Sequence, residues 1–461
     1  MRSRPHVLIA GGSVAGVEAL LALRAVAGQG PSIELLSPDP HLAYRPLRVT
    51  EPFELGEVRR FPLADIAADQ RADFRFGALT SVEPQARRAR LRSGEWLSYD
   101  ALLVATGARA RNAVPGSLLF HGRGGTNDMA AVLEAARDGR IRCLAFAVPP
   151  GVSWPLPLYE LALLTAWRLQ QQGVSGVTLT FVTTEREPLD LFGAEAAARV
   201  RAMLGERGID LRTGTRPVEA GGGRVVLADG SSIPAESTIT VPCLAGPGIF
   251  GLPADSEGFI PVDAHGRVLG VEDVYVAGDA ADFPVKQGGL ATQQADAAAE
   301  AIAARLGSPR SPQPFRPVLR AALLTGAAAL YLRTDLDDDR APPEVAGRSL
   351  WWPPGKIAGR YLSPYLVQLE RPAPEPSVFE DPGPPGGEEP ADAADREAAV
   401  ELALMMADDE AASGSAWRAL DWLEAAETLN GVLPPEYVAQ RRRWHLVRER
   451  AAARRRAEHA R

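Results

Sequence analysis

The sequence predicts an α/β protein in which two domains built on parallel sheets are interleaved, followed by a C-terminal helical appendage. Two apolar segments far apart in the chain carry this prediction, residues 7–23 (VLIAGGSVAGVEALLAL) and residues 274–282 (VYVAGDAAD). A third segment, residues 99–108 (YDALLVATGA), lies between them. Each reads as a buried strand that ends in a glycine-containing motif. Three such strand ends in this order are much less frequent by chance than any one of them.

The first segment reads as a strand, a glycine-rich turn and an amphipathic helix. In such a turn, the helix N-terminus and free backbone N–H groups face a phosphate. The loop is Gly-x-x-x-x-Gly with one added glycine, and a serine replaces the middle glycine of the G-x-G-x-x-G pattern. The turn therefore predicts a pyrophosphate site formed by Gly11, Gly12, Ser13, Ala15 and Gly16.

The other two segments place polar groups at the same edge of the predicted sheet. Gly278 and Asp279 follow the last strand, where the carboxylate would accept hydrogen bonds from a sugar-like chain. Thr106 and Gly107 end the strand that returns the chain to the first sheet. A pyrophosphate site combined with a carboxylate for a polyhydroxylated chain predicts FAD as the cofactor.

Together, the three motifs resemble those of the flavoproteins with two Rossmann-like dinucleotide-binding domains. Within that family, the sequence is most similar to the branch that holds type II NADH dehydrogenases and sulfide:quinone oxidoreductases. The resemblance covers roughly residues 5 to 370. It implies an FAD-dependent oxidoreductase that passes electrons from a donor through flavin to a quinone-like or other acceptor. The competing hypothesis is a non-catalytic flavin-binding scaffold that recruits a partner.

We expect six segments along the chain. They are a first part of the FAD-binding domain (1–112), a second domain of the NAD(P)-binding type (113–243), a second part of the FAD-binding domain (244–315), a C-terminal region covering the flavin and acceptor site (316–370), a linker rich in proline and glycine (371–394) and the helical appendage (395–461). Within region 316–370 we expect a hairpin around Gly326 and a short helix ending near Tyr365.

Residues 142–183 repeat the opening plan of strand, turn, helix and strand, where the resembled family binds NAD(P)H. The turn holds one glycine and two prolines, and each proline removes an N–H donor that a pyrophosphate would use. Glu185 follows the second strand and could hold a ribose; a solvated loop carboxylate is the alternative reading. Whether NAD(P)H is the donor is therefore left open.

Further cofactor contacts are expected after the second strand of the FAD-binding domain. Ser37 stands where an acidic residue usually binds the ribose, and Asp39 could share that role. Arg45 and Pro46 belong to a segment that lies along the cofactor in the resembled family. Arg45 would neutralise pyrophosphate charge or stack on adenine, and a surface salt bridge is the alternative.

Lysine is nearly absent from this chain. Of 50 lysine and arginine residues, only Lys286 and Lys356 are lysines. Lys286 precedes Gln287 and Gly288 at the start of a predicted helix that would face the flavin. A compact ammonium there would stabilise negative charge on reduced flavin, so Lys286 is the predicted catalytic residue. Gln293 and Gln294, on the same helix, are similar to a motif that borders the quinone pocket of type II NADH dehydrogenases.

The cysteines argue against thiol chemistry. Cys143 and Cys243 are the only two, each lies in a strand-like run, and no C-x-x-C is present. A redox disulfide needs two thiols close enough to bond. In the resembled sulfide-oxidising branch, a cysteine would stand at the position of Trp154, so sulfide is not the expected donor. The scattered histidines predict no metal site.

Composition limits the partners. A net charge of −8 disfavours nucleic acid. The chain has no apolar run of transmembrane length and no signal-peptide pattern, so we expect a cytoplasmic protein. The partners expected are a small-molecule electron donor and acceptor. The basic C-terminal helix could contact the inner face of the membrane or a partner protein; a solvated helix end is the alternative.

Overall fold

The computed structural model describes residues 4–338, 340–369 and scattered positions between 400 and 441. Its first sheet consists of parallel strands in the order β20-β9-β1-β2-β5. These strands are β20 (Val274–Val276), β9 (Ala101–Val104), β1 (His6–Ala10), β2 (Ser32–Ser37) and β5 (Asp73–Phe76). Residues before 105 and after 273 thus form one sheet, as the three strand-end motifs predict.

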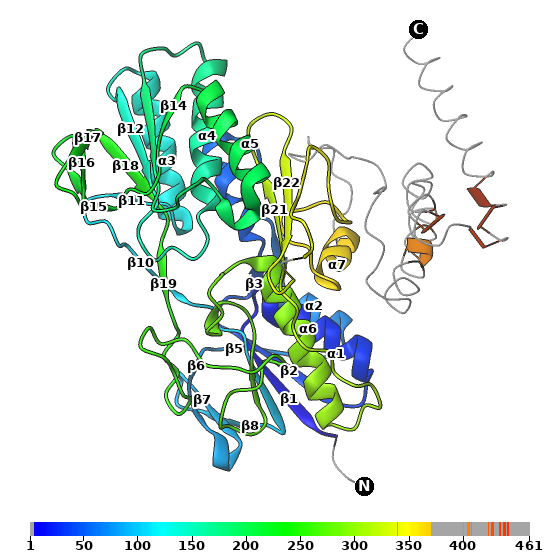
Figure 1. Cartoon of the computed structure of the whole chain (residues 1–461). Helices are drawn as coiled ribbons and strands as arrows, with labels where there is room; N and C mark the ends of the chain where they lie inside the picture. The colour runs from blue at the N-terminus through cyan, green and yellow to red at the C-terminus, as the bar shows by residue number, and fades with distance from the viewer. Residues whose placement is uncertain are drawn as a thin grey trace, which may run out of the picture. The chain divides into compact units, whose positions relative to one another are not determined.

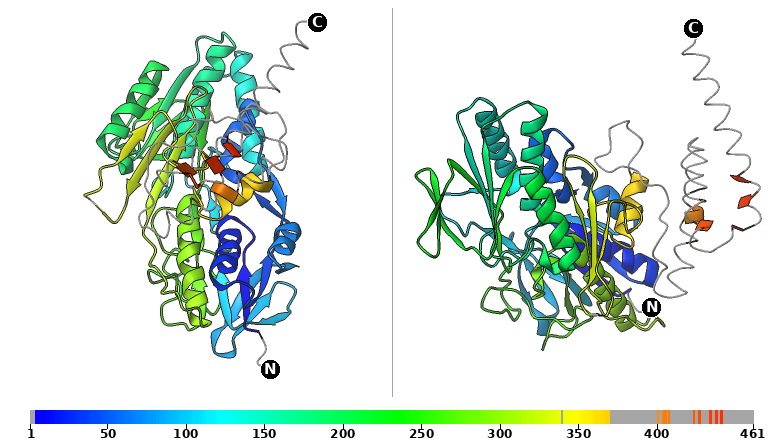
Figure 2. Two further views of the ribbon diagram at one scale, coloured as in Figure 1. Left: turned by 90° about the vertical axis from the view of Figure 1, so that its right-hand side faces the viewer. Right: turned by 45° about the horizontal axis from the view of Figure 1, so that its top comes forward.

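Helices α1 (Val14–Ala27) and α6 (Gly288–Arg305) cover one face of this sheet and lie side by side (Figures 1 and 2). Alternate residues of β1 face opposite sides. Val7 and Ile9 pack with the two helices, whereas Leu8 and Ala10 pack with a second apolar cluster on the other face. Because both faces are covered, the strands read as continuous apolar runs in the sequence.

The second sheet has the order β11-β18-β12-β13-β14 and is also parallel. Its strands are β11 (Leu118–Leu119), β18 (Ser237–Thr240), β12 (Cys143–Ala147), β13 (Thr178–Val182) and β14 (Ile209–Arg212), and its helices are α3 (Gly122–Arg137), α4 (Leu156–Gln171) and α5 (Gly193–Glu206). Strands β10 (Arg109–Arg111) and β19 (Cys243–Ala245) pair where the chain leaves and re-enters the first lobe (Figure 1). The predicted pair of interleaved Rossmann-like domains is confirmed.

Smaller elements complete the two lobes. In the first lobe they are β3 (His41–Ala43), the 3₁₀ helix η1 (Arg45–Phe53), β4 (Arg60–Pro62), α2 (Leu63–Asp69), β6 (Leu79–Glu83), η2 (Pro84–Ala86), β7 (Arg88–Leu91), β8 (Trp96–Ser98) and η4 (Gly278–Ala280). In the second they are η3 (Asp190–Phe192), β15 (Pro217–Gly221), β16 (Arg224–Leu227) and β17 (Ser232–Pro234).

The region after α6 forms an antiparallel sheet and one helix. The predicted hairpin is confirmed as β21 (Val318–Leu323) and β22 (Leu330–Asp335), to which β23 (Glu344–Ala346) adds. The short helix, α7 (Leu362–Leu369), continues past its predicted end at Tyr365. It starts at Leu362 because the acceptor for its first N–H groups is a carboxylate on α1.

Residues 348–354 and 380–461 form a unit separate from the rest of the chain. Within it, Trp351 is buried and its carbonyl accepts from Ser349 Oγ at 2.6 Å. The predicted linker, and most of the predicted appendage including the basic C-terminal helix, lie outside the described residues. None of the helices in the described part of the chain has the length and apolar character needed to cross a bilayer.

Candidate functional site

The carboxyl ends of β1, β9 and β20 meet at one edge of the first sheet because the three strands are parallel neighbours. A cavity of about 350 Å³ lies at this edge. Such an edge is where ligands bind in open parallel sheets. Ten of the predicted site residues line the cavity: Ser13, Ala15, Arg45, Pro46, Gly107, Gly278, Asp279, Lys286, Gln287 and Gly288.

The glycine-rich turn shapes one wall of this cavity. Gly11 has φ 134°, and a Cβ at Gly11 or Gly16 would collide with the carbonyl groups of Ala105 or Gly11. Ser13 precedes α1 without capping it, and the first turn of α1 has no acidic residue. The first N–H groups of α1 are therefore available to an anion, as a pyrophosphate site requires.

The remaining predicted residues lie behind the cavity wall or beside it. A side chain at Gly12 would meet Ser37 at 2.8 Å, so this glycine permits close packing of the turn on β2. Thr106 is exposed next to Gly107. Ser37 Oγ donates to Asp39 O at 2.7 Å and accepts from Asp39 N at 3.1 Å. The serine hydroxyl is thus engaged within its own turn, which does not support its predicted role in binding ribose.

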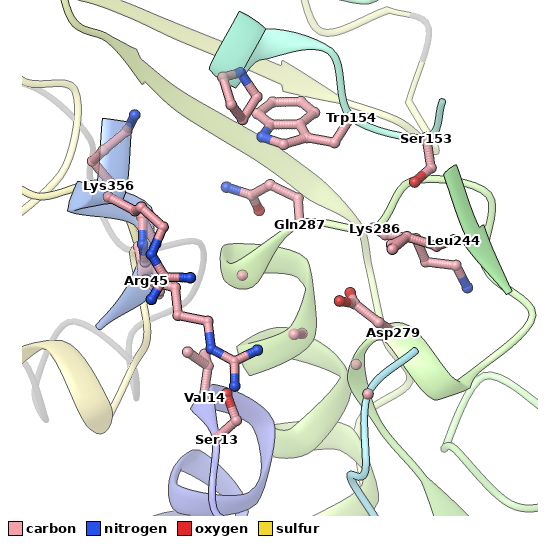
Figure 3. Close-up of a pocket in the computed structure, with 18 of the residues that line it drawn as sticks. Ser13, Val14, Arg45, Ser153, Trp154, Leu244, Asp279, Lys286, Gln287 and Lys356 are labelled. Atoms are coloured by element: carbon pink, nitrogen blue, oxygen red, sulfur yellow. The ribbon is translucent and has the colours of Figure 1, made fainter. Parts of the chain in front are cut away.

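Arg45 lies at the start of η1 with its guanidinium beside Ser13 (Figure 3). It is exposed, and it forms no ion pair with any residue that the structure describes. The surface salt bridge considered as the alternative reading is therefore absent there. A guanidinium next to a helix N-terminus adds positive charge to an anion site, and the planar fork suits two phosphate oxygens.

Asp279 and Lys286 carry opposite charges on the far wall. Burial raises the pKa of Asp279, against the opposing effects of Lys286 and Arg45. Burial lowers the pKa of Lys286 to about 8, against nearby carboxylates. The Lys286 ammonium donates to Ala281 O and lies 3.8 Å from the centre of the Phe259 ring. In Figure 3 it points past Leu244, toward a second cavity of about 530 Å³ that Lys286 also lines.

Gln287 caps the start of α6, and Gln294 joins α6 to the strand end at Gly278. Gln287 Oε1 accepts from Leu290 N at 3.0 Å and so caps the helix, while its Nε2 donates to Arg320 O. Gln294 Oε1 accepts from Gly278 N at 2.8 Å. Gln293 makes two hydrogen bonds to the backbone of Val318. Gln293 and Gln294 are not among the residues that line the cavity at the sheet edge, so their place beside an acceptor pocket stays a prediction.

Lys356 also lines the cavity, and it forms a buried ion pair with a carboxylate that the sequence analysis missed. Lys356 Nζ contacts both carboxylate oxygens of Glu160, which is fully buried on α4. Glu160 also accepts from Leu324 N at 2.8 Å. Burial raises the pKa of Glu160 and lowers that of Lys356. The scarcity of lysine draws attention to Lys356, but no local pattern points to Glu160.

The turn of the second domain is poor in donors. Helix α4 begins at Leu156, between two prolines, and Val152 N bonds back to Pro149 O. Trp154 packs edge-on against Phe192. Glu185 accepts from Tyr159 Oη, Thr183 Oγ1 and Leu189 N, and its pKa is raised by burial. The carboxylate is bonded inside the domain, so the solvated-loop reading does not hold, and ribose binding by Glu185 stays a prediction.

Both cysteines are free thiols, on different sheets. Cys243 Sγ lies 3.3 Å from Pro150 O, and burial raises the pKa of this thiol. A thiol that stays protonated is a poor nucleophile. The predicted absence of a redox disulfide agrees with this arrangement.

Comparisons with known proteins agree with the geometry. Residues 161–302 match the model of the family described as pyridine nucleotide-disulphide oxidoreductase. The ferredoxin–NAD(+) reductase component of the biphenyl dioxygenase system of Paraburkholderia xenovorans is 30% identical over 61% of the chain and 69% of that protein. The chain belongs to the pyridine nucleotide-disulphide oxidoreductase family. It is accordingly an FAD-dependent oxidoreductase.

Two further comparisons, one of sequence and one of structure, are with the sulfide:quinone enzyme of Aquifex aeolicus. The sulfide-quinone reductase of Aquifex aeolicus is 25% identical over 54% of this oxidoreductase and 61% of the relative. The solved structure of the sulfide:quinone oxidoreductase from Aquifex aeolicus superposes with a TM-score of 0.69, at 20% identity, over 74% of this chain and 86% of that chain. That likeness supports the fold.

Proposed function

We propose that this oxidoreductase binds FAD in the cavity at the edge of the first sheet and reduces a quinone there. The α1 N-terminus and Arg45 would hold the pyrophosphate, Asp279 the ribityl chain, and Lys286, Gln287 and Gly288 the flavin. The uncapped helix start, the close-packed glycine turn and the buried carboxylate fit that cofactor. When bound, FAD would accept two electrons from a donor and pass them to an acceptor.

The acceptor is proposed from the apolar part of the cavity lining. That part includes Phe120, Trp154, Val241, Ala322 and Ile357. A flat apolar molecule fits such walls, and reducing a quinone takes up two electrons and two protons. The Lys356–Glu160 pair, whose lysine also lines the cavity, can donate a proton, because burial lowers the pKa of the Lys356 ammonium. This buried pair is the observation that carries the proposal.

For the donor we propose NADPH, bound weakly. The second domain keeps the βαβ unit of a dinucleotide site, but prolines remove donors from its turn, and each lost hydrogen bond to a charged group is worth about 1.5–3 kcal/mol. The Glu185 carboxylate is engaged internally, and the next residue, Arg186, is exposed. An arginine there suits a 2′-phosphate. The reaction is NADPH + H⁺ + quinone → NADP⁺ + quinol.

The experiment compares two acceptors in FAD-loaded protein. Ferricyanide takes electrons without protons, whereas a short-chain quinone needs both. Lys356→Met should lower quinone turnover at least tenfold while leaving ferricyanide turnover within about twofold, in keeping with the usual contribution of a positioned proton donor. Arg186→Gln serves as the matched test of the donor and should raise the KM for NADPH without changing the KM for NADH.

Two results would overturn the proposal. Equal losses with both acceptors would show that Lys356 supports the fold or the flavin rather than proton delivery. If the FAD-loaded protein is reduced by neither NADPH nor NADH, a nicotinamide donor is excluded. The hypothesis of a non-catalytic flavin-binding scaffold would then be favoured.

We also propose the location and the division of the chain predicted above. A cytoplasmic protein that meets the inner face of the membrane would reach a membrane quinone, and the similarity to a sulfide-quinone reductase supports a quinone as the acceptor. The domain limits near residues 112, 243 and 315 remain predictions, as does a partner for the C-terminal helices. Fractionation of cells into soluble and membrane-bound protein, with and without residues 395–461, tests the membrane contact.

A further inference from the structure

The segment Gly355–Tyr361, here called the strap, carries two of the cavity residues. Lys356 and Ile357 both line the cavity. Ile357 N donates to Tyr44 Oη at 3.1 Å, and the Ile357 side chain packs on Gly288 at the start of α6. The strap has no regular secondary structure of its own. The position of the strap therefore depends on its contacts with neighbouring elements, and the shape of the cavity depends on the position of the strap.

Glu18 on α1 is the main anchor of the strap. Its side chain is fully buried, Oε1 accepts from Tyr361 N at 2.9 Å, and Oε2 accepts from Leu362 N at 2.6 Å. These N–H groups begin α7, where a carboxylate is favourable. A Cβ at Gly359 would lie 2.9 Å from Glu18 Oε2, so the strap passes directly over this carboxylate.

A second carboxyl group lies close to Glu18. Burial and the nearby Glu18 carboxylate raise the pKa of Asp296 on α6, whose Oδ1 is buried without a hydrogen-bond partner among the described residues. Arg360, on the strap, is the nearby cation, and its guanidinium is partly exposed and 3.8 Å from Glu300. Glu18 is fully buried and Asp296 partly buried, and ionising two neighbouring carboxyl groups away from water is costly, so we expect the docked strap to hold at least one shared proton.

We propose that Glu18 and Asp296 are positioning residues of the cavity and that the strap docks onto α1 and α6 with uptake of a proton into this carboxyl pair. Undocking exposes both carboxyl groups to water, where they ionise. Docking places Lys356 and Ile357 in the cavity, and undocking withdraws them. The link to catalysis rests on the proposed function; the link between docking and the proton does not.

The direction of the pH dependence follows from the two groups. Burial raises the pKa of Glu18 to about 7 and raises that of Asp296 well above its ordinary value. Both pKa values exceed the values near 4 that the groups have in water, so the docked state binds more protons than the undocked state. The docked state therefore becomes less stable relative to the undocked state as pH rises. Glu300 and Arg360 face the pair as charged groups, and Tyr361 stays neutral because burial raises its pKa to about 12.

Hydrogen exchange at the Tyr361 and Leu362 amides tests this inference in the FAD-loaded protein. After correction for intrinsic exchange, protection should fall at least tenfold per pH unit between pH 6 and 8, which corresponds to one proton per docking event. The double variant Glu18→Gln/Asp296→Asn keeps the size and hydrogen bonding of both groups and should show no pH slope. Glu300→Gln, on the same helix as Asp296, is the control and should keep the wild-type slope.

The outcome does not depend on turnover, so it is distinct from a test of the proposed function. A pH-independent wild type would refute the inference, and so would an unchanged slope in the double variant. Protection of the β1 amides, measured in the same experiment, reports whether the double variant is folded. If β1 protection is lost, Asp296→Asn alone replaces it and should lower the slope by one proton; an unchanged slope there is equally a refutation.

Discussion

Removing the Lys356 ammonium should leave one of the most buried charges in the molecule without its partner. Glu160 is fully buried and Lys356 nearly so, and the ammonium contacts both carboxylate oxygens. The remaining partner of Glu160 is Leu324 N at 2.8 Å. In Lys356→Met the carboxylate keeps its desolvation penalty and loses its counter-ion. Breaking a buried pair in this way destabilises a protein by about 3–5 kcal/mol.

The loss should depend on pH, with opposite signs for the two single variants. Without Lys356, the pKa of Glu160 rises further above its ordinary value, so Lys356→Met should lose stability as pH rises, by about 1.4 kcal/mol per pH unit. In Glu160→Gln, the buried Lys356 has a pKa below its ordinary value, so that variant should gain stability as pH rises. In wild type the paired charges contribute neither slope, so each variant is compared with wild type at the same pH.

Urea unfolding followed by tryptophan fluorescence at pH 6 and pH 8 measures these free energies. The double variant Lys356→Met/Glu160→Gln is the control, because a neutral amide retains the bond from Leu324 N and no charge is left buried; it should lie within about 1.5 kcal/mol of wild type. A Lys356→Met protein that matches wild type at both pH values would refute the reasoning. The reasoning would also be refuted if the unfolding free energies of the two single variants changed with pH in the same direction.

Three further predictions concern the cofactor site. Gly12→Leu should yield colourless protein that does not regain FAD, because the side chain would collide with Ser37 and displace the turn from β2; absorbance at 450 nm measures it. Cys143→Ser with Cys243→Ser should keep flavin reduction within about twofold of wild type, since neither thiol has a thiol partner; stopped-flow reduction is the measurement. Lys286→Met should lower the flavin midpoint potential by several tens of millivolts, because a charge at contact is worth on the order of 4 kcal/mol at an effective dielectric near 20 and 30 mV corresponds to about 1.4 kcal/mol. The difference from wild type should disappear above about pH 8, where Lys286 loses its proton; coincident redox titrations at pH 7 would contradict it.

Structural features that depend only on short stretches of sequence could be predicted. The turn at Gly11–Gly16 and the Gly278–Asp279 strand end depend on local backbone conformation and on strands that are apolar along their whole length. Parallel strands must then bring their carboxyl ends together, which places these motifs at one cavity. The hairpin of β21 and β22 was predictable for the same reason, because its turn and its alternation are local.

Features that depend on partners distant in the chain could not be predicted. Glu160 and Glu185 both read as helix or loop carboxylates, and their partners are set by how the second domain packs. Glu18 likewise sits in an ordinary amphipathic pattern on α1. The start of α7 could not be predicted, because its capping group is that Glu18 carboxylate, more than 300 residues earlier in the chain.

The two lysines illustrate why composition carried more information than any single motif. The other 48 of the 50 basic residues are arginines. A guanidinium cannot give up its proton in a protein and requires partners for five N–H groups, so it suits exposed or bidentate positions such as that of Arg45. Lys286 and Lys356 are both buried beside the cavity, and burial lowers the pKa of each. Under the proposed function, a compact cation that can lose its proton would serve a site for coupled electron and proton transfer. Arginine at either position would keep the charge and remove the proton exchange.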